Sequence, residues 1–256
     1  MILFVFEGTR REPDIFKTLE YLYFPKGQTI VCSFGNNIYE LYRQLKALGG
    51  EGDLVSILRE KYENSPDNPF SPETKTSDFS EIFLFFDYDF QNRNLTIEQM
   101  NMQISEMLEL FNDETDNGLL YINYPMIEAI RYTKELPDSH FSDYRVSRTD
   151  CHDKGFKDMA QQFSAYRSLD FIVIDFRRPP SEKKVSIVKQ NWALLERQNV
   201  VKANMICTGE LDIPADKSTI SQQKIFEAQV SQFIIPKDEV AILSAFPLFN
   251  FNYFKH

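Results

Sequence analysis

Runs of apolar residues alternate with helix-spaced apolar positions along the first half of the chain. Every position from 2 to 6 is apolar and rich in β-formers, which is typical of a strand buried on both faces of a parallel sheet. From residue 13 to residue 23 the apolar positions instead recur at the spacing of a helix that begins at a proline. The pattern repeats with further predicted strands at 29–34, 82–86 and 119–122, and further predicted helices at 38–48, 53–62 and 97–111. This order predicts an α/β sheet of parallel strands with helices on both faces.

Two segments of this half lack a simple strand or helix pattern. Residues 64–78 hold three prolines among many Ser, Thr, Asn and Asp residues, which predicts a loop or a mobile insertion with poor order. The tripeptide at 123–125, Asn-Tyr-Pro, predicts the entry to a further helix that carries Glu128.

Beyond about residue 134 the alternation of strands and helices ends. Helical patterns return in three stretches, at 156–166, at 185–201 and at 220–254, where a Phe-rich tail closes the chain. Residues 171–174 fit either a strand or a buried helix. We expect the tail aromatics to pack onto the domain, with a partner surface as the alternative. The predicted organisation is an α/β domain at 1–133 and a mixed, mostly helical region at 134–256.

The composition is that of a globular protein. Hydrophobic residues make up 43% of the chain and 23 residues are Phe, which excludes a disordered or collagen-like chain. No apolar run approaches the ~18 residues of a membrane span, and no basic stretch precedes residues 2–6. We therefore expect a cytoplasmic protein without signal peptide or membrane anchor. The three cysteines lie far apart without a Cys-x-x-Cys, which fits reduced thiols and argues against a zinc or disulfide framework.

The formal net charge of −10 is unevenly distributed along the chain. Residues 145–189 hold 10 basic and 6 acidic side chains, whereas residues 1–144 hold 12 basic and 25 acidic ones. This contrast suggests a metal-binding region followed by a phosphate-binding one. A solvated charge pattern without a ligand is the alternative.

Acidic residues follow two of the predicted strands. Glu7 comes directly after the first strand, and Asp87 and Asp89 follow the third. The carboxyl ends of parallel strands meet at one edge of a sheet, and residues two apart in an extended segment point to the same side. Close carboxylates are costly as free anions, and protonation, a basic partner or a divalent cation relieves that cost. We therefore expect Mg²⁺ or Mn²⁺ here, with a second ion if Glu12 or Glu128 joins; caps and turns are the alternative role for such acids.

These acids belong to a longer pattern. It consists of Glu7-Gly8, then Glu12-Pro13 and Phe16, then Asp87-x-Asp89 after a buried strand, then Asn123-x-Pro125-x-x-Glu128. Over roughly residues 1–133 this pattern resembles the TOPRIM domain of RloB-like proteins, which are relatives of the OLD-family nucleases. The resemblance implies a compact TOPRIM fold with a parallel sheet and Mg²⁺ binding by Glu7, Asp87 and Asp89. It also implies metal-binding or supporting roles for Glu12 and Glu128.

A catalytic lysine is a further implication of the resemblance. OLD-type nucleases use a lysine from the region after the TOPRIM core, which makes Lys154 and Lys157 candidates here. Their spacing does not choose between them or exclude solvated surface lysines.

Four arginines are candidates for substrate binding. Arg10 and Arg11 lie in the turn after Glu7, where a helix N-terminus favours phosphate; pairing with nearby acids is the alternative. Arg177 and Arg178, together with Lys183 and Lys184, lie in the basic stretch and are predicted to follow a nucleic-acid backbone. A solvated face is the alternative for this second group.

The function predicted from these features is that of a metal-dependent endonuclease that hydrolyses DNA or RNA. The chain has no Gly-x-x-x-x-Gly-Lys-Ser/Thr sequence, so it is not expected to hydrolyse ATP itself. RloB-like proteins and the TOPRIM subunits of PARIS-type systems are associated with a separate ATPase, so the resemblance implies an ABC- or AAA-type partner and antiphage defence. Self-association into a homo-oligomer stays open.

Three other classes of function were weighed. The first is a non-catalytic TOPRIM-like scaffold that docks on an ATPase. The second is a phosphoacceptor receiver domain, which also has acids after its first and third strands, although Glu7-Gly8 lacks the usual acidic pair. The third is a serine or cysteine hydrolase, which is disfavoured because the chain has no Gly-x-Ser-x-Gly sequence. Its three histidines are also far apart, and His152 is interpreted as a loop residue rather than a general base.

Overall fold

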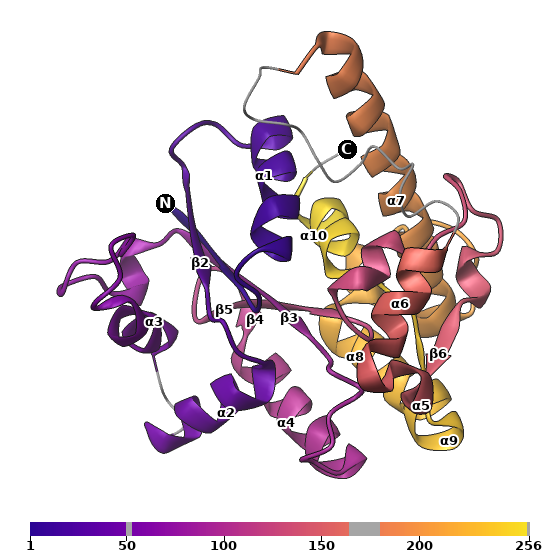
Figure 1. Cartoon of the computed structure of the whole chain (residues 1–256), viewed down its shortest axis with the longest axis horizontal. Coiled ribbons are helices and arrows are strands. Elements are labelled where there is room, and N and C mark those ends of the chain that lie inside the picture. The colour runs from indigo at the N-terminus through magenta and orange to yellow at the C-terminus, as the bar shows by residue number, and fades with distance from the viewer. Residues whose placement is uncertain (50–52, 164–179, 255–256) are drawn as a thin grey trace. The chain divides into compact units, whose positions relative to one another are not determined.

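The computed structural model describes residues 1–49, 53–163 and 180–254 (Figure 1). These residues form two compact units. The first contains Met1–Phe86 and Leu95–Tyr121, and the second contains Asp87–Asn94 and Ile122–His256. The predicted boundary at residue 133 stays a prediction.

A mostly parallel, five-stranded sheet organises the first half of the chain, as predicted. Its strands, in spatial order, are β2 (Thr29–Ser33), β1 (Ile2–Phe6), β3 (Glu81–Asp87), β5 (Gly118–Asn123) and β4 (Asn112–Asp113). β1 pairs in parallel with β2 and with β3, so that Phe6 lies opposite Ser33 and Phe85. β4 runs antiparallel to β5 and was not predicted, because its two exposed residues carry no apolar pattern.

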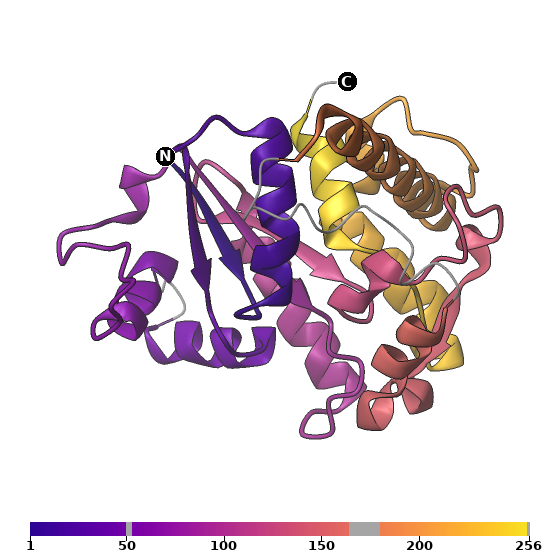
Figure 2. The same ribbon diagram turned by 45° about the horizontal axis from the view of Figure 1, so that its top comes forward.

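Aromatic side chains fill the space between this sheet and helix α1 (Arg11–Tyr23). The rings of Phe4 and Phe16 lie 4.1 Å apart between centroids, and Phe4 also stacks on Phe83 of the neighbouring strand at 5.4 Å. Because side chains alternate along a strand, these aromatics form one face of the sheet. Figure 2 shows α1 lying along the strands on this face.

The opposite face of the sheet carries the alternate side chains and is covered by other helices. Phe34, just past β2, packs against Phe86 of β3 with centroids 6.0 Å apart. Three helices belong to this half: α2 (Ile38–Ala47), α3 (Leu54–Tyr62) and α4 (Ile97–Leu110). α2 and α4 are joined where the Tyr42 hydroxyl donates to Glu106 Oε2 at 3.1 Å. A capping box of Thr96 and Gln99 starts α4.

The segment at 64–78 is a loop, as predicted, and it is attached to α3. Arg59 donates from Nη1 to the carbonyl oxygens of Pro72 and Thr74 at 2.8 and 3.1 Å. Phe70 is buried against Tyr62, and a 3-10 turn, η1 (Thr76–Asp78), ends the loop. These contacts anchor the loop to α3, which differs from the prediction of poor order.

The C-terminal region is mainly helical, as predicted. Its longer helices are α6 (Gly155–Gln162), α7 (Glu182–Thr208), α8 (Gln222–Gln229) and α10 (Ala245–Tyr253). Its shorter elements are η2 (Ile127–Arg131), η3 (Phe141–Asp143), α5 (Arg148–Cys151), η4 (His152–Lys154), η5 (Lys217–Ile220), the π-helix η6 (Val230–Ile234) and α9 (Ile235–Lys237). The tail aromatics Phe246 and Phe249 are buried, as expected of residues that pack onto the fold.

Three details of this region differ from the predictions. Glu128 lies on the 3-10 helix η2 and not on an α-helix, and α6 ends at Gln162. Two short strands that pair antiparallel, β6 (Arg145–Ser147) and β7 (Glu239–Ala241), were not predicted because each has only three residues. The predicted strand or helix at 171–174 lies outside the described residues.

No helix among the described residues combines the length and the apolar character needed to cross a membrane.

Candidate metal centre

The residues predicted to bind metal follow the carboxyl ends of two neighbouring strands. The backbone N–H of Glu7 continues the β1–β3 ladder by donating to Phe85 O at 3.0 Å. Asp87 is the last residue of β3, two positions beyond Phe85. The parallel register thus places both carboxylates just past the last ladder bond, where loops replace the sheet.

Asp87 is largely buried and is oriented by a side-chain amide. It is 7% exposed, and its Oδ1 accepts a hydrogen bond from Asn123 Nδ2 at 3.0 Å. The Oδ1 of Asn123 in turn accepts from the backbone N–H of Ala245 at 2.8 Å, at the start of α10. This chain of bonds fixes the orientation of the Asp87 carboxylate.

Asp89 comes to the same place through an unusual backbone conformation. Its φ of 53° is left-handed, which Asp tolerates better than most residues. Its N–H donates to Pro125 O at 3.2 Å, and its Oδ1 accepts from Gln91 Nε2 at 2.6 Å. Burial raises the pKa of the Asp89 carboxyl, while the Gln91 hydrogen bond and the positive charge of Lys157 lower it. Tyr88, between the two acids, is fully buried.

Glu7, Asp87 and Asp89 each offer one oxygen atom to a common point. These oxygens lie within 4.8 Å of one another. Mg²⁺ binds oxygen at about 2.1 Å in an octahedron, so its ligands are at most roughly 4.2 Å apart, and Ca²⁺ spreads them to roughly 5 Å. Three hard carboxylate oxygens at this spacing fit either ion, and Mg²⁺ needs a small contraction.

The two additional acids have different surroundings. Glu12, on the first turn of α1, is 4% exposed, and its Oε1 accepts from the N–H of Gly8 at 3.0 Å. A Cβ at position 8 would lie 2.5 Å from Glu12 Oε2, so a larger residue there would require the Glu12 carboxylate to move. Glu128 is buried on η2. Neither residue belongs to the oxygen group found in the described part of the chain, and their metal-binding roles stay predictions.

The two candidate lysines differ in one respect. The positive charge of Lys157 lowers the pKa of the Asp89 carboxyl, although less than the Gln91 hydrogen bond does. Lys154 is exposed and precedes α6, and its backbone has a left-handed conformation with φ of 66°. The next residue must be glycine, because a Cβ on Gly155 would lie 2.2 Å from Asp150 O. This tight turn fixes where α6 begins and therefore where Lys157 lies.

The structure describes part of the set of predicted substrate-binding residues. Arg10 and Arg11 are exposed at the start of α1, at the end of the turn that follows Glu7. Lys183 and Lys184 lie in the first turn of α7. Arg177 and Arg178 lie outside the described residues.

Two residues that support the site were not predicted as functional. One is Asn123, which orients Asp87. The other is Arg148, which donates from Nε and Nη2 to the carbonyl oxygens of Phe90 and Asn92 at 3.2 and 2.7 Å. Because Asn92 N also donates to Asp89 O at 2.8 Å, Arg148 holds the turn that carries Asp89. Asn123 belongs to the Asn123-x-Pro125-x-x-Glu128 pattern, which gave it no role of its own, whereas Arg148 has no local sequence signal because it acts on residues distant in the chain.

Comparisons of this chain with protein-family models, with curated proteins and with solved structures found no match.

Proposed function

We propose that this protein is a Mg²⁺- or Mn²⁺-dependent endonuclease with a TOPRIM-like domain, which hydrolyses phosphodiester bonds of DNA or RNA. The observation that carries the proposal is the convergence of the Glu7, Asp87 and Asp89 oxygens within 4.8 Å. The same three residues are those that the resemblance to TOPRIM nucleases singles out.

The donor set suits a hard divalent cation. When bound, such an ion would polarise the scissile phosphate and lower the pKa of an attacking water. Asp87 would meet the ion in a fixed direction, because Asn123 already holds its other oxygen. Asp89 would be held in place by its turn, to which Arg148 donates two hydrogen bonds.

Positive side chains would serve the substrate. The Lys157 ammonium, which already acts on Asp89, would offset negative charge that builds up on the phosphate during hydrolysis. Arg10 and Arg11, exposed at the first turn of α1, would contact a neighbouring phosphate.

The biological setting of the proposal comes from the resemblance alone. It consists of antiphage defence together with a separate ATPase subunit, since the chain carries no phosphate-binding loop of its own.

The test is cleavage of plasmid DNA and of total tRNA by the purified protein with Mg²⁺ or Mn²⁺. We expect cleavage of at least one substrate, and a loss of about 10²-fold or more in Asp87→Asn, because one fixed charge in such a site contributes that much. Asp67→Asn, an exposed acid of the 64–78 loop, is the matched control and should keep full activity.

Two results would contradict the proposal. One is equal cleavage by the wild type and Asp87→Asn. The other is no cleavage by the wild type, alone or with an ATPase that copurifies from native cells, which would favour the scaffold. Transfer of phosphate from acetyl phosphate to Asp87 would favour the receiver domain instead.

A further inference from the structure

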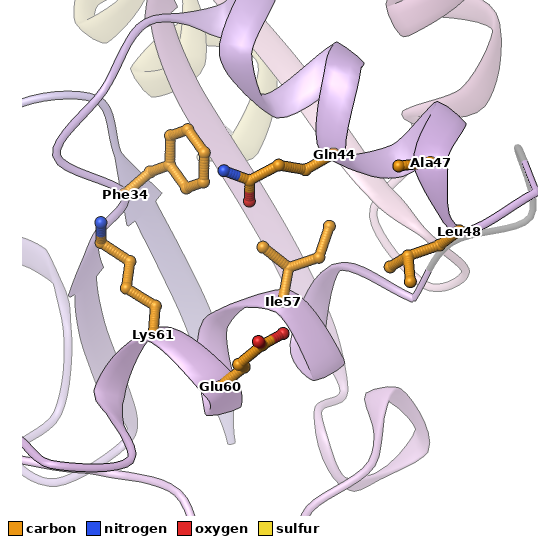
Figure 3. A pocket seen from close by; sticks show the side chains of 7 residues that line it. All are labelled: Phe34, Gln44, Ala47, Leu48, Ile57, Glu60 and Lys61. Carbon is orange, nitrogen blue, oxygen red and sulfur yellow. The ribbon is translucent and has the colours of Figure 1, made fainter.

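A hollow of about 510 Å³ lies between α2 and α3 on the first unit (Figure 3). Its apolar lining includes Phe34, Leu48 and Ile57, and its polar lining includes Gln44, Glu60 and Lys61. Ligand pockets for small organic groups have volumes of this order. The size and the mixed lining suit a flat heterocycle with a charged substituent.

One end of the hollow adjoins the strand end that carries Glu7. Phe34 follows β2, and its N–H donates to Phe6 O at 2.7 Å. The next residue, Gly35, donates from its N–H to Glu7 O at 2.8 Å. These two hydrogen bonds connect the segment that lines the hollow directly to the backbone of Phe6 and Glu7.

Lys61 gives this end a positive charge. Its Nζ lies 5.3 Å from the centroid of the Phe34 ring, and it would lie 3.6 Å from a Cβ at position 35. The ammonium therefore lies close to Gly35, the residue whose N–H donates to Glu7 O. Phe34 is itself buried, so the exposed Lys61 ammonium is the group that would meet a phosphate at this end of the hollow.

The other polar groups provide hydrogen-bond acceptors. Gln44 donates from Nε2 to Glu40 Oε1 at 2.8 Å, which fixes the amide and leaves its oxygen to point into the hollow (Figure 3). Glu60 adds a carboxylate to the lining. Exocyclic amino groups of adenine, cytosine and guanine are donors that match such acceptors.

We propose that the α2–α3 hollow binds one unpaired nucleotide of the substrate strand, with its base over Ile57 and Leu48 and its phosphate at Lys61. This inference rests on the proposed nuclease function and names its substrate class. That class is single-stranded or locally unpaired nucleic acid, because a base stacked within a duplex does not enter a pocket without flipping out.

The test is fluorescence anisotropy of labelled 12-nucleotide DNA and RNA single strands, and of their duplexes, with the full chain in EDTA. Removing the metal separates binding in the hollow from hydrolysis. Two variants probe the hollow. Ala47→Trp fills it from an exposed position of α2, and Lys61→Gln removes its charge. The controls are Met102→Trp, at an exposed position of α4, and Lys26→Gln, before β2.

We expect the single strands to bind more tightly than the duplexes, and Ala47→Trp to weaken single-strand binding about fivefold or more. Lys61→Gln should lower the slope of log affinity against log salt by about 0.7, the value for one phosphate of a single strand. Both controls should bind like the wild type, and circular dichroism should show all variants folded.

Wild-type affinity and salt slope in both hollow variants would overturn this inference while leaving the nuclease proposal intact. Equal affinity for duplexes and single strands would overturn the assigned substrate class. A wild-type protein that neither binds nor cleaves any nucleic acid would overturn the hollow and the nuclease proposal together.

Discussion

The amide of Asn123 decides how Asp87 presents its carboxylate. It joins Asp87 Oδ1 to the backbone N–H of Ala245, with both bonds buried. Groups that orient a metal ligand typically account for 10- to 100-fold in affinity. We therefore expect Asn123→Ala to weaken Mn²⁺ binding by about 10- to 100-fold, measured by isothermal titration calorimetry.

Asn117→Ala, in the exposed turn before β5, is the control for this prediction and should bind Mn²⁺ like the wild type. Thermal unfolding of both variants would show that the protein remains folded at the titration temperature. Unchanged Mn²⁺ affinity in folded Asn123→Ala would show that Asp87 needs no such support.

The two lysines before and within α6 should differ in their effect on cleavage. Lys157 influences the Asp89 carboxyl, whereas Lys154 is an exposed residue of the preceding turn. We expect Lys157→Met to lower the cleavage rate by roughly 10²-fold, with Mn²⁺ binding kept, because the charge acts on the substrate phosphate. Lys154→Met should cleave like the wild type. Equal effects of the two substitutions in the rate assay would contradict the assignment.

At this scale the sequence predicted which acids lie close together better than it predicted the residues that orient them. Glu7, Asp87 and Asp89 could be selected because they lie at or just after the ends of apolar strands, which is a local pattern. The bond between Asn123 and Ala245 joins residues 122 positions apart, and no local pattern encodes it. Lys157 differs from Lys154 in its effect on the pKa of Asp89, which depends on the folded structure and not on the local sequence.

At the scale of elements, the turn after β3 depends on α5. Arg148, the first residue of α5, donates to two carbonyl oxygens of the turn that holds Asp89. Without these two hydrogen bonds from Arg148, the backbone of Asp89 would be expected to leave its left-handed conformation. Such conformations persist only when their surroundings impose them. We expect Arg148→Met to weaken Mn²⁺ binding about tenfold, read by calorimetry.

Arg131→Met, on η2, is the comparison for Arg148→Met because it removes the same charge from another short helix. If the two variants bind Mn²⁺ with equal affinity, the effect is one of net charge and not of the turn.

Helix α7 carries a buried lysine that links stability to pH. The Nζ of Lys202 donates to Phe141 O at 3.0 Å and also to Tyr144 O, and burial lowers its pKa well below the usual value. The unfolded chain keeps the ordinary pKa of about 10.4, so between the two values it binds more protons than the folded protein does. The free energy of unfolding contributed by Lys202 therefore rises with pH in that window.

Urea unfolding between pH 7 and pH 9 tests this linkage. Relative to Lys202→Met, the wild type should gain stability as the pH rises, by at most about 1.4 kcal/mol per pH unit. The comparison uses the difference in free energy of unfolding between the two proteins at each pH. The cysteines and the N-terminus titrate in both proteins, so their contributions cancel in this difference. A wild type that loses stability relative to Lys202→Met over this range would show that the folded protein keeps the lysine charged.

Elements were predictable where their pattern is long. The apolar run of β1 and the helical spacing of α4 and α7 each extend over enough residues to define a period. β4, β6 and β7 have two or three residues, too few to show alternation. Glu128 follows Pro125 by three residues, and the expected α-helix is replaced by the tighter η2.

At the scale of the whole molecule, the net charge of −10 opposes indiscriminate binding to nucleic acid. In the proposed nuclease, substrate binding would then come from local groups, such as Lys61 beside the α2–α3 hollow and a cation held by the three carboxylates. Cleavage should fall steeply when the cation is removed, because the acidic strand ends would otherwise repel phosphate.

The most direct measurement of the central claim is Mn²⁺ binding followed by electron paramagnetic resonance, in the wild type and in Glu7→Gln, Asp87→Asn and Asp89→Asn. We predict that the wild type binds Mn²⁺, that Mg²⁺ competes for the same site, and that each substitution weakens binding by about tenfold or more while Asp67→Asn does not. Wild-type affinity in Glu7→Gln together with Asp87→Asn would contradict the account, because residues from two strand ends would then not share one ion.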